Sequence, residues 1–163
     1  MSQLAEYLKT TGKEISAKTK ENRPLLDEWA RDVEQFLKTV RHVIESADTE
    51  KVLFLRDSRV RLREVRFGEY ELPSLEIVLG DTEVRVEPRA RFNVGRLKDP
   101  ISGSEHQVEG RIDITDGVRR YLAYRVPLVE KGHYGWYVCD EDRKRMRFWS
   151  DQVIQDVVLD LLQ

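Results

Sequence analysis

Asp113 is the acidic residue with the most suggestive surroundings for metal-dependent chemistry. It lies in the segment Gly110–Ile114, which is predicted to be one strand of a β-hairpin, and Tyr121–Val126 is predicted to be the other. Hard divalent cations prefer oxygen ligands, so two carboxylates on neighbouring strands can hold such an ion, and a nearby lysine can orient or activate a water molecule. Asp113 would supply the first of these carboxylates.

This pair of strands resembles the paired-strand core of the PD-(D/E)xK nucleases, in which an Asp on one strand and a Glu-x-Lys on the next hold a metal beside the scissile phosphate. The resemblance spans residues 110–126 and implies that Asp113 is a metal ligand. The positions for Glu and Lys, however, hold Ala123 and Arg125, so the second carboxylate is missing. A divergent hydrolase is therefore a minor alternative. The simpler interpretation is a three-residue loop, 115–117, that sets Asp113 opposite Arg119 as a cross-strand ion pair.

Other patterns that would indicate catalysis are weak. His106, His133, Cys139 and Asp140 lack the close spacing of metal ligands, and the nine glycines are scattered at predicted turns rather than gathered in a phosphate-binding loop. We therefore expect no metal, no cofactor and no catalytic centre.

Arginine dominates the middle of the chain. Residues 51–150 carry 20 basic side chains, 16 of them Arg, against 17 acidic ones. In the strongly alternating segment 83–94, Arg85, Arg89 and Arg91 share one predicted face with Glu83 and Glu87. Arginine on a sheet can bind phosphates or single-stranded nucleic acid, but interleaved glutamates can equally neutralise it through cross-strand ion pairs. An Arg-mediated nucleic-acid or phosphate-binding domain is the main alternative function.

Aromatic residues gather near the end of the chain and offer a second candidate site. Large aromatics fill cores, but they are also enriched at the centres of protein interfaces. Together with the predicted long loop 95–107, they would form a docking surface for another protein. The candidate binding residues are Tyr134, Trp136 and Trp149, with Tyr137 and Phe148 beside them.

The element that must position these groups is an amphipathic helix over Pro24–Ala47, in which apolar residues alternate at spacings of three and four. The sequence predicts an α+β fold: a long, curved antiparallel β-sheet packed on this N-terminal helix and closed by a C-terminal helix that Ser150 caps. We expect a single domain over 1–163, with 1–22 as a weakly ordered helical arm or linker in which Gly12 interrupts the helix. Phase changes within 59–72 indicate β-bulges or sharp bends, and Pro88 indicates an edge strand or a kink.

Composition limits the class of protein. The net charge of −2 disfavours a general polyanion binder, and no stretch has the length and apolar character of a membrane span or a signal peptide. The single cysteine favours a reducing compartment, so we expect a cytoplasmic protein. The preferred function is a non-enzymatic interaction protein whose partner is another protein, and a small-molecule pocket is a further alternative. The sequence leaves the partner and the oligomeric state open.

Overall fold

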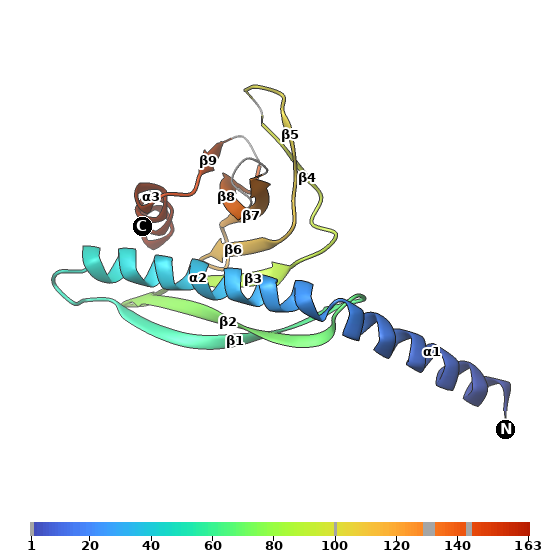
Figure 1. Ribbon diagram of the computed structural model, residues 1–163. Helices are drawn as coiled ribbons and strands as arrows, with labels where there is room; N and C mark the ends of the chain where they lie inside the picture. Colours follow the sequence, from blue (N-terminus) through green and yellow to red (C-terminus); the bar gives the residue numbers. More distant parts are fainter. Residues whose placement is uncertain (1, 100, 129–132, 143–144) are drawn as a thin grey trace.

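The predicted α+β architecture is confirmed. The computed structural model describes residues 2–99, 101–128, 133–142 and 145–163. Within them, helices flank a seven-stranded antiparallel sheet of order β1-β2-β3-β6-β7-β8-β9, and β4 and β5 form a separate two-stranded sheet (Figure 1). The elements are α1 (Gln3–Glu21), α2 (Arg23–Ala47), β1 (Phe54–Glu64), β2 (Gly68–Leu79), β3 (Thr82–Ala90), β4 (Arg96–Lys98), β5 (Glu105–Gln107), β6 (Arg111–Thr115), β7 (Arg120–Leu128), β8 (His133–Asp140), β9 (Met146–Phe148) and α3 (Asp151–Leu162).

Helix α2 forms where the apolar periodicity predicts it. Pro24 lies in its first turn, where the missing N–H leaves no hydrogen bond unmade. The apolar stripe packs on the sheet, and α2 contributes more buried side chains to the core than either of the other helices. Its buried side chains are Trp29, Val33, Phe36, Leu37, Val40, Val43 and Ile44.

Helix α3 closes the same core, as predicted. The Ser150 hydroxyl accepts a hydrogen bond from the Val153 amide at 3.2 Å, which satisfies one of the unpaired donors of the first turn. Its buried side chains join those of α2 in one hydrophobic cluster. None of the helices in the described residues has the length and apolar character needed to cross a membrane.

Helix α1 is longer than expected. It runs without a break through Gly12 and the following polar residues, so the predicted interruption is wrong. The Ser2 hydroxyl caps its start by accepting from the Ala5 amide at 3.1 Å. None of its residues is buried, and it projects from the body as an extension of α2 (Figure 1).

The phase changes within residues 59–72 come from a hairpin turn and not from bulges. Strand β1 ends at Glu64, the amide of Phe67 donates to the carbonyl of Glu64 at 3.1 Å, and Gly68 begins β2 with φ of +73°. Two strands joined by a short turn change the phase of alternation just as an inserted residue does, so the pattern alone did not distinguish them.

Pro88 marks a kink, and the edge-strand alternative is wrong because β3 lies between β2 and β6. The register of β3 with β6 shifts between Pro88 and Ala90. On its other side, β3 pairs with β2, and the last pair is Leu75 with Val86. If the pairing continued in the same register for two more residues, Pro73 would lie opposite Pro88. Neither proline can donate to a ladder. The β1–β2 ribbon therefore continues alone beyond this point.

The hairpin β6–β7 has a longer loop than predicted, so the register differs. Thr115 pairs with Arg120 and Asp113 pairs with Leu122, which leaves a four-residue loop, 116–119. Side chains close that loop: the Asp116 carboxylate accepts from the amides of Val118 and Arg119 at 2.8 and 2.7 Å. The predicted Asp113–Arg119 pair is therefore wrong, and Arg119 instead lies near Asp116 and Asp160.

The predicted long loop 95–107 contains the hairpin β4–β5. Leu97 of this hairpin and Val108 are buried against Leu122, Tyr124 and Cys139, on the face of the sheet opposite the helices. Both faces of β7 are therefore buried, so alternation of apolar and polar residues does not tell the two faces apart.

Candidate functional site

The three candidate arginines of strand β3 do not form one surface. Arg91 follows the kink and is only 6% exposed, with its Nη2 3.6 Å from the Glu109 carboxylate. Arg89 is exposed and lies 3.7 Å from the carboxylates of both Glu87 and Asp113. Arg85 is half-buried, and it lies opposite Glu76 on β2 and opposite Thr115 on β6.

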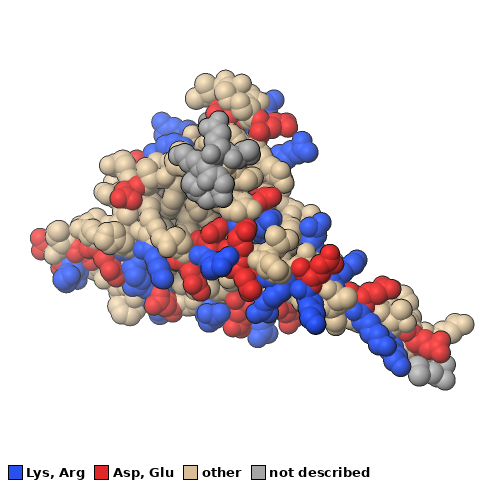
Figure 2. All heavy atoms as spheres, viewed as in Figure 1, with Lys and Arg blue, Asp and Glu red and all other residues tan. Residues whose placement is uncertain are grey.

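Arginines of the β1–β2 ribbon also lie beside carboxylates. Arg59 and Arg61 are 3.4 and 3.7 Å from the Glu71 carboxylate, and Arg56 pairs with Glu76. Figure 2 shows basic and acidic side chains interleaved along α2 and the ribbon below it. This face of the molecule does not carry a patch of one sign.

Asp113 is held by arginines and is buried, with 2% of its surface exposed. Arg111 donates to both of its carboxylate oxygens, at 2.7 and 3.0 Å. These hydrogen bonds raise the pKa of Arg111, although burial acts in the opposite direction. Because Asp113 pairs with Leu122, Ala123 and Arg125 point to the opposite face of the sheet. The positions that the nuclease motif needs together are therefore apart, and no group of potential metal ligands occurs among the described residues.

Arg125 is the centre of a polar cluster on the helix-facing side of the sheet. Its side chain is fully buried. Its Nε donates to Asp32 at 2.8 Å, its Nη2 donates to Glu28 at 2.9 Å, and its Nη1 donates to the Glu109 carbonyl at 3.0 Å. The guanidinium thus ties α2 to β7 through two carboxylates one helical turn apart.

The charges of this Arg125 cluster do not cancel. Two arginines, Arg91 and Arg125, face three carboxylates, those of Glu28, Asp32 and Glu109, which leaves a net charge of −1. Burial tends to raise the pKa of Glu28, but the hydrogen bond and charge of Arg125 hold it below its usual range, so Glu28 stays ionised.

Tyr134, Trp136 and Trp149 come together at the edge of this cluster. All three are half-buried and line one open hollow of about 230 Å³ with Asp32, Gln35, Phe36 and Thr39, which we call the aromatic hollow. Phe36 stacks on Trp149 with ring centroids 4.7 Å apart and 11° between the planes, and it tilts against Trp136 at the same separation. The Trp149 amide donates to the Trp136 carbonyl at 2.9 Å, which fixes the two rings beside each other.

The aromatic hollow also has polar groups in its lining. Burial and a hydrogen bond to Glu109 raise the pKa of Tyr134 to about 12, so its hydroxyl stays protonated. The indole N–H of Trp149 is buried and has no hydrogen-bond partner among the described residues. Thr39 donates to the carbonyl of Gln35 at 3.0 Å. The walls are thus aromatic, and the rim carries an acid, an amide and a hydroxyl.

Sequence reasoning missed Glu28, Asp32 and Arg125. Two patterns could have indicated them. Glu28 and Asp32 are four residues apart and border the apolar stripe beside Trp29, so they share one edge of the helix. Arg125 interrupts the otherwise apolar run of β7, and a charge in such a run needs a buried partner.

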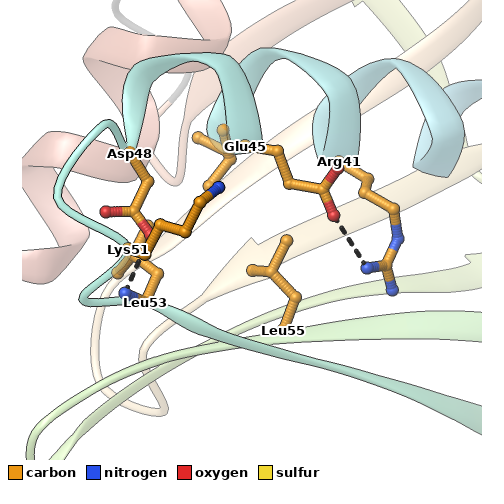
Figure 3. A pocket seen from close by; sticks show the side chains of 7 residues that line it. Arg41, Glu45, Asp48, Lys51, Leu53 and Leu55 are labelled. Carbon is orange, nitrogen blue, oxygen red and sulfur yellow. Dashed lines mark hydrogen bonds and ion pairs between the residues drawn. The ribbon is translucent and has the colours of Figure 1, made fainter.

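A larger hollow of about 440 Å³ lies where α2 turns into β1 (Figure 3). Three of its four charged side chains, those of Arg41, Glu45 and Asp48, bind each other or the backbone. Arg41 pairs with Glu45 at 3.2 Å, and the Asp48 carboxylate accepts from the amides of Val52 and Leu53, both at 2.9 Å. These contacts account for the hollow as part of a well-held turn.

Comparison of the chain with protein-family models, with curated proteins and with solved structures found no match.

Proposed function

We propose that this chain is a non-enzymatic, cytoplasmic interaction protein that accepts a positively charged side chain of another protein in the aromatic hollow. One observation carries the proposal: Tyr134, Trp136 and Trp149 line the same open hollow as Asp32, beside a cluster of net charge −1. The cytoplasmic location rests on the sequence, which has a single cysteine.

The chemistry of the hollow favours a cation. Aromatic ring faces attract ammonium and guanidinium groups, and a nearby carboxylate strengthens that attraction. The molecule itself contains such a contact, because the guanidinium carbon of Arg125 lies 3.5 Å from the centroid of the Tyr134 ring. A lysine or arginine from a partner would meet the remaining aromatic walls and offset the residual negative charge.

The nucleic-acid alternative receives less support from the contacts. Arg91 is buried, Arg89 lies beside two carboxylates, and Arg59 and Arg61 share Glu71. Binding to phosphates would have to compete with these ion pairs. A small-molecule function has no enclosed apolar cavity to support it among the hollows described above.

The proposal is tested by following the three tryptophan indole N–H signals in ¹H–¹⁵N NMR spectra. The probes are short capped peptides that contain a single Lys, a single Arg or, as the control, a single Glu. We expect the Trp136 and Trp149 signals to move with the basic peptides at millimolar concentration and not with the acidic one.

Variants give the test its specificity. Asp32→Asn and Tyr134→Ala should weaken binding of the basic peptides at least about tenfold, as expected when a desolvated cation contact is lost. Phe148→Ala is the matched control, because that aromatic is exposed and lies outside the hollow. Equal shifts with basic and acidic peptides, or no shift at all, would overturn the proposal.

A further inference from the structure

The exposed apolar side chains of the body and of the arm form two separate groups. Of the twelve large apolar side chains that are exposed in the described residues, four lie on α1 and four lie where β1 begins and β2 and α3 end. Three of the others are at hairpin tips and the fourth is on β9. The first group is Leu4, Tyr7, Leu8 and Ile15, and the second is Val52, Phe54, Leu79 and Leu159.

The α1 group forms an apolar stripe without a partner. Leu4, Leu8, Thr11 and Ile15 follow one another at spacings of four, three and four, so they share one helical face. Its large apolar members are 53–65% exposed. Most helical stability in proteins comes from packing an apolar face and not from intrinsic propensity. Covering the stripe with another apolar surface would therefore stabilise α1.

The second group lies around an apolar groove of about 370 Å³ between the end of α2 and α3, which we call the α2–α3 groove. Val52, Leu79 and Leu159 line it, together with Ala47, Leu53 and Leu162. A groove between two helices is the usual receptor for the apolar face of a third helix. Its apolar lining thus matches the apolar stripe that α1 presents.

The arm and the groove cannot meet within one molecule. Helix α2 has 25 residues and so spans about 37 Å. Helix α1 leaves the first residue of α2 and points away from the body (Figure 1). The groove lies at the other end of α2, where Ile44 and Ala47 line it. We propose that α1 of one copy docks in the α2–α3 groove of a second copy, which gives head-to-tail association.

Charge favours this occupant over a pair of α1 arms. The charged residues that line the groove, Asp48 and Asp156, are both acidic, and α3 has no basic residue. Asp156 already pairs with Arg147 at 2.9 Å, so Asp48 is the acid that a docked lysine would neutralise. On α1, Lys18 follows Ile15 on the same face, so a lysine extends the stripe. Two α1 arms would bring only Leu4, Leu8 and Ile15 from each helix along the seam, which is shorter than the about three to four heptads that coiled coils need.

The proposed contact joins unlike surfaces, so each bound pair retains one free arm and one free groove. Such heterologous contacts close into rings or extend into open chains. Association should therefore increase with protein concentration, and it stops at a dimer only where two copies exchange their arms.

The test measures the molar mass of the full chain by sedimentation equilibrium across a wide concentration range. Leu8→Glu damages only the arm and Leu159→Glu only the groove, and both side chains are exposed, so both variants should fold. Val118→Glu, at the exposed tip of the β6–β7 loop, is the matched control. Circular dichroism checks each fold.

We expect the unaltered chain and the Val118 control to associate, and each of the other variants to associate at least about tenfold more weakly. A mixture of the two variants should form a 1:1 dimer and stop there, because one supplies an intact arm and the other an intact groove. A chain that stays monomeric throughout would overturn the proposal. So would an effect of Leu8→Glu without one of Leu159→Glu, which would indicate paired arms. Neither outcome bears on the aromatic hollow, whose peptide test is separate.

Discussion

The guanidinium of Arg125 lies over the ring of Tyr134, with its central carbon 3.5 Å from the ring centroid. The two residues are on the paired strands β7 and β8. The same guanidinium donates to Asp32 and Glu28 of α2. Helix and sheet are thus joined by a polar contact within an otherwise apolar interface. The contact also holds one face of Tyr134, which leaves the rest of the aromatic hollow to a partner.

Replacing Arg125 with Met should destabilise the fold by about 2–3 kcal/mol, because Glu28 and Asp32, which are 36% and 33% exposed, would lose their buried counter-ion and the Glu109 carbonyl would lose its donor. Urea denaturation measures the change in the free energy of unfolding. Adding Glu28→Gln and Asp32→Asn to the Met variant should recover part of the loss, since no unpaired charge would remain. A loss below about 1 kcal/mol in the single variant would show that the cluster does not hold α2 in place.

The stability of the fold should fall in alkaline solution. Burial, with hydrogen bonds to Glu109 and Asp160, raises the pKa of Tyr134 and of Tyr121 to about 12 each, against an ordinary value of 10.0. Unfolded tyrosines would ionise first, so the stabilisation is complete below pH 10 and is lost as the pH rises toward 12. Urea denaturation at a series of pH values measures the slope. It should be shallower in a Tyr121→Phe/Tyr134→Phe variant, and an unchanged slope would contradict the assignment.

Gly110→Ala should destabilise the fold by about 3 kcal/mol or more, through overpacking and backbone strain. The backbone of Gly110 has φ of +149°, and an added Cβ would lie 2.4 Å from Cζ3 of Trp29. Thermal denaturation gives the change. Gly12→Ala is the control, because nothing lies within 4 Å of its added Cβ and Ala favours a helix. Equal stability of the Gly110 variant would mean that Trp29 does not pack against this strand.

Single-stranded oligonucleotides should bind weakly, with a slope of log affinity against log salt that corresponds to fewer than about two phosphate contacts. The reason is that carboxylates accompany most of the sheet arginines described above. Fluorescence anisotropy across a salt series measures the slope, with Arg59→Glu/Arg61→Glu/Arg63→Glu as the comparison. These arginines are exposed, so the variant should fold. Tight, salt-sensitive binding that the variant abolishes would favour the nucleic-acid alternative over the aromatic hollow.

The elements that the sequence predicted well are those with one apolar face. Helix α2 shows strict spacing from Trp29 to Ile44, and Ser150 marks the start of α3, so both were placed closely. Strands β6 and β7 were placed as a hairpin with the wrong register. Both of their faces are buried, so alternation gave no guide, and the side chain of Asp116 selected the longer loop.

Of the candidate site, the aromatic residues could be predicted and the charged ones could not. Tyr134 and Trp136 are on β8, and Trp149 directly follows β9, the strand that pairs with β8. Asp32 and Arg125 are 93 positions apart and meet only because α2 lies across the sheet. Arg91 was grouped with Arg85 and Arg89 by simple alternation, but the register shift after Pro88 sends it into the interior. Long-range contacts and kinks of this kind leave no periodic trace in the sequence.

Asn22 alone joins α1 to α2. Its amide and side-chain nitrogen both donate to the Lys18 carbonyl at the end of one helix, while its own carbonyl accepts from Leu25 and Leu26 in the next. Because no loop separates the two helices, the backbone torsions of Asn22 set the direction of the whole 19-residue helix α1. A rotation of about 20° there would move the tip of α1 by about 10 Å, since the helix is about 28 Å long. The reach of the arm can thus change while every contact of the body stays as it is.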